Sequence, residues 1–207
     1  MRARYIEAKD TAKLIRKALR AAHPEAKFSV RTRTYAGGAS IDVGWTDGPT
    51  RDDVENVTDL YRGGGFDGSI DLAYSRAAWL HSDGSVTFAE TGGTEGSRGS
   101  VPSDYGAPLN ETAELVTFGA RYVFTNRTVS PEMMGAAVAL IRAWDRRGYG
   151  DGRQCSPGCG DWMGADHLGW LARWEHGHAI VCSPECAATL EIRSGHIRPS
   201  SRVGASA

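Results

Sequence analysis

Four cysteines within 32 residues constrain the fold of this chain more than any other feature. They form two short pairs, Cys155-Ser-Pro-Gly-Cys159 and Cys182-Ser-Pro-Glu-Cys186, in a chain of 207 residues. A turn with this spacing aims two thiolates at one point, and a second turn supplies the other two. Four soft ligands favour tetrahedral zinc. We therefore predict a structural zinc site held by Cys155, Cys159, Cys182 and Cys186.

The second cysteine pair also predicts the start of a helix. Ser183 is a favourable N-cap, and Pro184 suits the first helical position. With the first pair in a loop, residues 150–207 resemble a treble-clef or zinc-ribbon module. The three-residue spacing departs from the two-residue spacing that is commoner in such modules.

Other uses of the cysteines remain open at this point. An iron–sulfur cluster also takes four cysteines. One of His176 and His178, which lie between the pairs, is an alternative ligand. Two disulfides require an oxidising compartment, and the first residues lack the apolar segment of a secretory signal. A site of four cysteines leaves no open coordination position, so its expected role is structural.

The residues before this module predict an α+β fold of small antiparallel sheets packed by helices. Asp10 is a favourable N-cap for a helix over 11–22. Two alternating stretches flank Gly37 and Gly38, which accept the positive φ of a tight turn. Residues 1–90 are expected to form one α-β-β-α-β domain, with a helix over 51–61, a strand over 66–74 and a hairpin of 78–80 with 86–88.

The first hairpin carries a candidate binding face. A two-residue turn at Gly37 and Gly38 pairs Arg33 with Asp42. The buried face is then expected to hold Val30, Thr32, Thr34, Ile41, Val43 and Trp45. The other face exposes Arg31, Arg33 and Tyr35, and two basic residues beside an aromatic suit phosphate contact and base stacking. A solvated face on which Asp42 neutralises Arg33 is the alternative.

Charge is distributed unevenly along the chain. Residues 1–36 hold ten Lys or Arg and three Asp or Glu, a net charge of +7, whereas residues 37–96 hold three and eleven, a net charge of −8. Four basic residues on the first helix form one stripe opposite its apolar face: Lys13, Arg16, Lys17 and Arg20. Such a stripe predicts contact with nucleic acid. The alternative is that the acidic segment folds back against the basic one.

The middle of the chain predicts a break between domains. Residues 91–109 are rich in Gly and Ser and indicate a linker or loop, and residues 110–149 indicate a strand followed by a helix. Residues 115–124 alternate strictly, and the set expected to be buried is Val116, Phe118, Ala120, Tyr122 and Phe124. Ser130 and Pro131 predict a helix that runs to about Arg147 and ends at Gly148.

Five stretches resemble a known family. They are Tyr5-Ile6, Lys27-Phe28-Ser29-Val30-Arg31, Val43-Gly44-Trp45-Thr46-Asp47-Gly48-Pro49-Thr50, Val54 and Phe66-Asp67-Gly68. Together they resemble the large polyvalent protein associated domain 29. The resemblance covers residues 1–75, extends at most to 147 and excludes the cysteine region. It implies a protein of a phage or conjugative element, of the kind that enters a recipient cell with the element's DNA, and it implies no catalytic residue.

These features favour binding over catalysis. The chain lacks the motifs G-x-x-x-x-G-K-[ST], H-E-x-x-H and G-x-S-x-G, and it has no apolar run long enough to span a membrane. We predict a cytoplasmic, non-enzymatic accessory protein that binds nucleic acid, with no membrane partner and no small-molecule substrate. One alternative is an adaptor or inhibitor that binds a host defence protein. The other is a metal-dependent nuclease that uses Asp67, Asp71 and Glu90.

Overall fold

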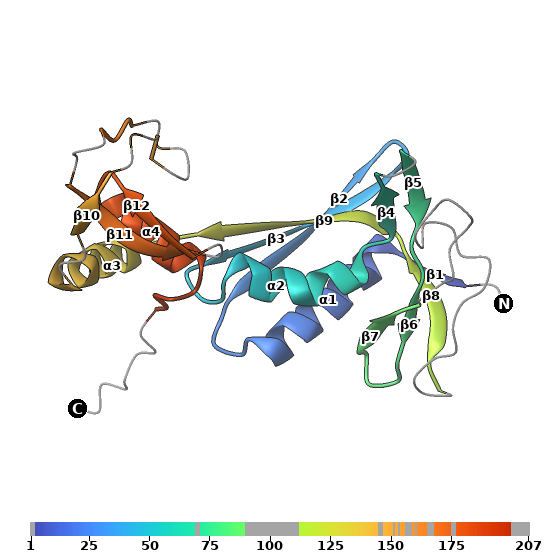
Figure 1. Ribbon diagram of the computed structural model, residues 1–207. Helices are drawn as coiled ribbons and strands as arrows, with labels where there is room; N and C mark the ends of the chain where they lie inside the picture. The colour runs from blue at the N-terminus through green and yellow to red at the C-terminus, as the bar shows by residue number, and fades with distance from the viewer. Residues whose placement is uncertain are drawn as a thin grey trace, which may run out of the picture. The chain divides into compact units, whose positions relative to one another are not determined.

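The computed structural model divides into two compact units, which are described separately (Figure 1). It describes residues 3–68, 71–89, 112–144, 147–150, 152, 154, 155, 159, 161–164, 168–174 and 177–199. The first unit comprises Met1–Trp45 and Asp52–Asn126, and the second comprises Thr46–Arg51 and Arg127–Ala207. The linker predicted over 91–109 lies outside the described residues. The mixture of helices and small sheets confirms the α+β class.

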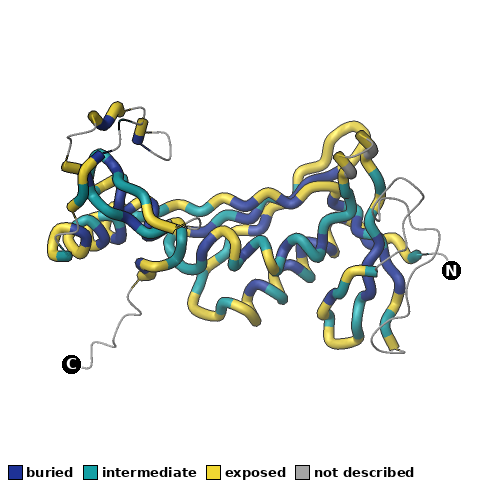
Figure 2. The backbone as a smooth tube through the Cα atoms, viewed as in Figure 1, coloured by how far each residue is buried: buried dark blue, intermediate teal, exposed yellow. Residues whose placement is uncertain are grey.

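A three-stranded sheet with two helices forms the centre of the first unit. Its order is β2 (Phe28–Tyr35), β3 (Gly38–Thr46) and β9 (Ala120–Thr128). The helices α1 (Ala8–Ala22) and α2 (Arg51–Thr58), the latter continued by the 3₁₀ turn η1 (Asp59–Tyr61), lie on one side of this sheet (Figure 1). Ile15 and Leu19 of α1 are fully buried in one cluster with Ile41 and Val43 of β3. Figure 2 shows this buried layer between helices and strands.

A second sheet and a small hairpin complete the first unit. The sheet has the order β1 (Arg4–Ile6), β8 (Glu114–Phe118), β6 (Ala78–Leu80) and β7 (Val86–Phe88), and β1 pairs with β8 in parallel. The predicted hairpin of 78–80 with 86–88 is therefore confirmed. The single strand predicted over 66–74 is wrong, because the chain forms a separate antiparallel hairpin of β4 (Gly64–Asp67) and β5 (Leu72–Ser75).

The first helix and hairpin differ in detail from the prediction. The helix α1 begins at Ala8, so Asp10 lies in its first turn, where it pairs with Lys13. The hairpin turn is Ala36-Gly37, with Gly37 at φ +94°, and Gly38 pairs with Tyr35. The true register opposes Arg33 to Ser40. This shift moves each partner by two residues, so the alternation is preserved and the expected face is buried, except that Thr32 is half-buried and Thr34 is exposed.

The alternating stretch 115–124 is not one strand. It divides at Gly119, where the chain passes from β8 in one sheet to β9 in the other. Gly119 N donates to Ile6 O at 2.7 Å, and a Cβ at Gly119 would lie 2.9 Å from that oxygen, so the crossing requires a glycine. Beyond it Ala120 is buried as expected, but the buried residues that follow are Val123 and Thr125. The expected burial of Tyr122 and Phe124 is therefore wrong.

A second glycine in the first unit lies against backbone and predicts a large effect of substitution. Gly63 N donates to Ala120 O at 2.8 Å, and a Cβ at Gly63 would overlap the carbonyl oxygen of Phe118. Since backbone cannot rotate away, we expect Gly63→Ala to lower the free energy of unfolding by about 3 kcal/mol in urea titrations. Gly68→Ala is the matched control, because its nearest neighbour would be the Phe66 ring at 3.9 Å. Equal stability of the two variants would contradict the close approach.

The second unit contains a three-stranded antiparallel sheet, one helix that packs against the sheet and another helix that packs against the first. The sheet has the order β10 (Arg147–Tyr149), β11 (Leu168–Trp174) and β12 (Gly177–Val181). Helix α3 (Pro131–Trp144) contributes Ala137 and Ile141 to the core, and α4 (Pro184–Arg193) contributes Ala187 and Leu190. Ser130 Oγ accepts from Met133 N at 3.1 Å, which confirms the predicted start of α3.

The predicted end of α3 at Gly148 is wrong. The helix ends at Trp144, and Arg147 and Gly148 lie in β10, where they pair with Trp170 and Gly169 of β11. A Cβ at Gly148 would lie 3.1 Å from Ile180 Cδ1, so this glycine fits beneath a side chain of β12. Helix signals at 131–144 are local, whereas β10 forms only by pairing with Leu168–Trp170, which lie much later in the chain.

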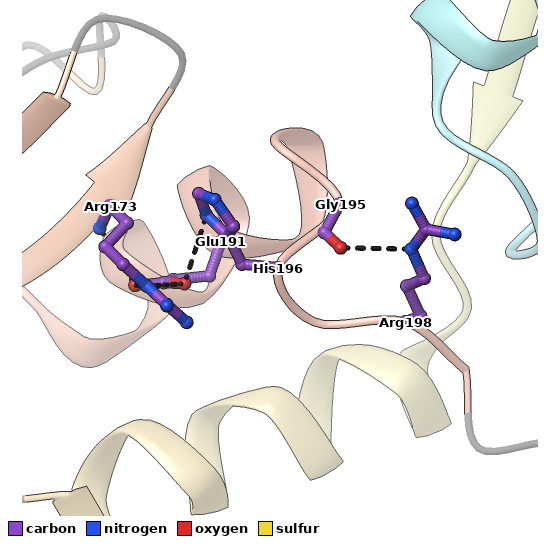
Figure 3. Close-up of polar contacts among 5 residues, drawn as sticks. All are labelled: Arg173, Glu191, Gly195, His196 and Arg198. Atoms are coloured by element: carbon purple, nitrogen blue, oxygen red, sulfur yellow. Dashed lines mark hydrogen bonds and ion pairs between the residues drawn. The ribbon is translucent and has the colours of Figure 1, made fainter.

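Among the described residues of the second unit, Glu191 is the one buried carboxylate (Figure 3). Glu191 of α4 is fully buried, and its Oε1 accepts from Arg173 N at 2.8 Å. Arg173 Nε lies 3.2 Å from Oε2, and His196 Nδ1 lies 3.5 Å from the same oxygen. The side chain therefore joins α4 to β11 and to the turn after the helix.

Candidate functional site

The two cysteine pairs are positioned by different local structures. Cys182 follows β12 directly, and Ser183 Oγ caps α4 by accepting from Cys186 N at 3.2 Å. This confirms the predicted cap and places Cys186 in the first helical turn. The first pair lies in a loop closed by the bridge between Gln154 and Trp162. Cys155 N donates to Asp161 O at 2.8 Å within that loop.

The four sulfur atoms converge on one point. They lie within 4.8 Å of one another, and all four cysteines are free of disulfides. Cys182 Sγ is 3.4 Å from Cys159 Sγ and 3.5 Å from Cys186 Sγ. A disulfide requires about 2.05 Å, whereas sulfurs around a tetrahedral zinc at about 2.3 Å are separated by about 3.8 Å. The cysteines are therefore arranged as a set that could hold a metal ion.

Burial gives the sulfurs different proton affinities. Burial raises the pKa of the Cys155 thiol to about 11, and burial also raises the pKa of Cys182. A hydrogen bond with the Asp161 backbone lowers the pKa of the exposed Cys159. Without a nearby cation the buried sulfurs therefore favour protonated thiols. A metal ion that binds here must displace these protons, because only thiolates are good ligands.

The other predicted metal ligands do not join this cluster. His178 is exposed on β12, where it pairs with Arg173, and His176 lies outside the described residues. Within the described part of the chain, the cysteines form the only group of three or more residues suited to a metal. Of the carboxylates considered for a nuclease, Asp71 is exposed, while Glu90 and the side chain of Asp67 fall outside the description.

The basic residues of α1 make contacts within the protein. Lys13 Nζ lies 2.7 Å from Asp10 Oδ1. Arg16 Nη2 donates to Val30 O at 2.6 Å, and Lys17 Nζ donates to Asp83 O at 2.6 Å. All four members of the stripe, Lys13, Arg16, Lys17 and Arg20, are exposed, so contact with a polyanion would compete with the first three pairings.

The predicted strand residues lie on the opposite side of the sheet from α1. Val30 faces the core, so its neighbour Arg31 projects from the open face, as do Arg33 and Tyr35. Arg33 Nε lies 2.9 Å from Asp42 Oδ2, which places both side chains on this face. The helix stripe and the strand residues therefore do not share one surface.

Two aromatic residues that the periodicity assigned to the core also lie on this open face. Val123 and Thr125 of β9 are buried, and Thr125 Oγ1 donates to Glu55 of α2 at 2.6 Å. The residues that alternate with them, Tyr122 and Phe124, are 47% and 50% exposed. Their rings are nearly parallel, with centroids 6.0 Å apart. No local signal predicts this, because the change of phase at Gly119 depends on contacts with β1.

Comparison with known families gives a match that covers most of the first unit. The family described as large polyvalent protein associated domain 29 matches residues 6–130, more than half of the chain. The chain belongs to this family. The domain 29 match extends well beyond residue 75, ends just before α3 and leaves all four cysteines outside. No curated protein and no solved structure matches the chain.

Membership in the domain 29 family indicates a protein associated with a phage or another mobile element. The residues that the structure describes include no helix of the length and apolarity that a membrane crossing requires.

Proposed function

We propose that this domain 29 protein is a non-enzymatic accessory protein that binds nucleic acid and carries a structural zinc ion in its second unit. The zinc proposal rests on the convergence of four sulfurs within 4.8 Å. The nucleic-acid proposal rests on the open sheet face, where Arg31, Arg33 and Tyr35 are all exposed. The two parts are independent, since the cysteines lie outside the family match.

Zinc suits the cysteine set better than other metals do. Four thiolates form a closed tetrahedral site, and zinc imposes no geometric preference of its own. Metal analysis of protein purified without added metal tests the proposal. We expect about one zinc per chain and no visible absorption from an iron–sulfur cluster. Iron with inorganic sulfide, or protein that contains no metal and cannot bind zinc, would overturn it.

Zinc affinity is expected to depend strongly on pH. The folded-state pKa of Cys155 is about 11 and that of Cys182 is also raised, so these thiols are protonated at neutral pH when no cation is present. Binding then releases protons, and lower pH opposes it. We expect the apparent affinity to fall by more than about 100-fold between about pH 8 and about pH 6. Competition titrations with a chromophoric chelator measure this, and a pH-independent affinity would contradict ligation by thiolates.

Binding of nucleic acid is expected to be weak and sensitive to salt, because phosphate contacts release counterions. Charge reversal separates the two predicted basic groups. If the sheet face makes the contact, Arg31→Glu with Arg33→Glu weakens binding of labelled oligonucleotides by at least about tenfold. Lys13→Glu with Arg20→Glu, on α1, tests the helix stripe in the same titration. Unchanged binding in both double variants would exclude both basic groups as the contact, and absence of binding by the unaltered protein would overturn the proposed function.

The adaptor hypothesis becomes the better account if the purified protein binds no nucleic acid. The same titrations therefore serve as the test between a nucleic-acid partner and a host defence protein. The nuclease hypothesis is tested separately by incubating nucleic acid with the protein and Mg²⁺ or Mn²⁺. Cleavage that is lost in Asp71→Asn would support it.

A further inference from the structure

We propose that the open face of the β2-β3-β9 sheet binds single-stranded nucleic acid, with unpaired bases stacked on Tyr122 and Phe124. This inference rests on the proposed function and specifies its ligand. The face, here called the stacking face, is defined by residues of the two outer strands: Arg31, Arg33 and Tyr35 on β2 and Tyr122 and Phe124 on β9.

The two outer strands present their side chains on the same face. Asp42 of the central strand points away from the core, because its neighbours Ile41 and Val43 are fully buried. Its ion pair with Arg33 shows that Arg33 projects from the same face, and Arg31 and Tyr35 share that face because they lie two residues from Arg33 on β2. On β9, Val123 belongs to the same core cluster as Val43, so Tyr122 and Phe124 point the other way. Figure 1 shows α1 and α2 on the core side of this sheet, and neither covers the stacking face.

The exposed rings are unusual for a sheet face that meets only water. Tyr35, Tyr122 and Phe124 are each about half exposed, at 48%, 47% and 50%. A clustered set of exposed apolar side chains marks an interaction surface more often than single ones do. The Tyr122 and Phe124 rings are tilted by only 22° to each other, so they present flat surfaces of the kind on which a base stacks.

The charge around the rings identifies the partner as a polyanion. Arg31 and Arg33 are exposed on β2, and the Arg121 guanidinium lies 5.8 Å from the centre of the Tyr122 ring. Asp42 is the acidic residue beside them and pairs with Arg33. Arg31 and Arg33 against the single carboxylate of Asp42 leave the surface positive. Strands in a sheet are about 4.8 Å apart, so the arginines on β2 lie about 10 Å from the rings, which allows phosphates and bases of one strand to contact both.

Stacking distinguishes a single strand from a duplex. Bases in a duplex are already stacked and paired, so protein rings have no access to their faces, whereas unpaired bases can splay onto a sheet. Each stacked base contributes about 1–3 kcal/mol, and this contribution is largely independent of sequence. The arginines would bind the phosphates of either form. The aromatic pair is therefore the part of the stacking face that selects unpaired nucleic acid.

Fluorescence anisotropy with labelled 12-nucleotide single strands of DNA and RNA, and with a duplex of the same length, tests the inference on the full-length protein. We expect single strands to bind at least about tenfold more tightly than the duplex. Tyr122→Ala with Phe124→Ala is expected to weaken single-strand binding by about 10- to 100-fold and to leave duplex binding unchanged. Tyr149→Ala is the matched control, since Tyr149 is 71% exposed on β10 in the other unit.

A second measurement keeps the test valid if the double variant folds poorly. Oligonucleotides that carry a photoreactive uracil are crosslinked to the unaltered protein, and we expect the modified peptide to contain Tyr122 or Phe124. Equal binding of duplex and single strand, or crosslinks confined to α1, would overturn the stacking face while the proposed function stands. Absence of binding to every oligonucleotide would overturn both.

Discussion

Replacement of Cys182 by serine is expected to abolish binding of the proposed zinc ion and to unfold the second unit, the largest effect that the structure predicts. Cys182 Sγ lies within 3.5 Å of two other ligand sulfurs, and it joins the end of β12 to the start of α4. Apparent free energies of structural zinc binding are about 10–16 kcal/mol at neutral pH, which exceeds the stability that a core of this size supplies alone. Chelation by a strong zinc ligand is expected to have the same effect.

Hydrogen exchange read by mass spectrometry measures this result for each unit. In Cys182→Ser, amides of β11 and β12 are expected to exchange at the rate of an unfolded chain, while those of α1 retain their protection. Ser183→Ala is the matched control beside the site, because it removes the cap of α4 at a cost of about 1 kcal/mol and leaves all four sulfurs in place. Protection of β11 and β12 that persists in metal-free protein would show that the cysteines do not order this unit.

Removal of the Glu191 carboxylate is expected to produce the second largest effect. Glu191→Ala leaves the Arg173 backbone N–H without its partner and separates Arg173 and His196 from the charge that they share. Breaking a buried pair by removing one partner costs about 3–5 kcal/mol, and the partial exposure of Arg173 places this case near about 3 kcal/mol. The melting temperature of the second unit should therefore fall by more than about 10 °C in calorimetry.

Another glutamate on the same helix supplies the control for this prediction. Glu185 pairs with Arg142 at 3.3 Å, but both side chains are more than half exposed, so Glu185→Ala should change the unfolding free energy by less than about 1 kcal/mol. Glu191→Gln retains oxygen and size and removes the charge, and we expect an intermediate loss. Identical melting of the Glu185 and Glu191 variants would show that the buried carboxylate does not stabilise the unit.

Elements whose signals lie close together in the chain could be predicted well. Ser183 and Pro184 start α4, and Ser130 and Pro131 start α3, because caps satisfy backbone groups within the next three residues. The cysteine cluster could also be predicted. Each short segment brings two sulfur atoms together locally, so a single contact between the two segments completes the set of four. The prediction of where α1 starts was less accurate, because Asp10 is a residue type that favours the cap position but lies inside the first turn.

The candidate binding surface depended on contacts that no local pattern contains. Periodicity groups Tyr122 and Phe124 with Val116, and that grouping fails because the strand changes sheets at Gly119. Likewise, the net charge of residues 1–36 does not reveal that α1 and the arginines of β2 project from different sides of one sheet.

The amino-acid sequence by itself determined the α+β class, the family, the four cysteines that could hold a metal ion and the face of the first hairpin that is buried. These properties follow from residue types and their spacing over a few residues, because an alternating strand or a capped helix start favours one local structure. The tertiary structure alone decided the place where β8 gives way to β9, the exposure of the aromatic pair and the strand at Arg147–Tyr149. The reason is physical: which face of a strand is buried depends on the layer that packs against it, and that layer comes from distant parts of the chain.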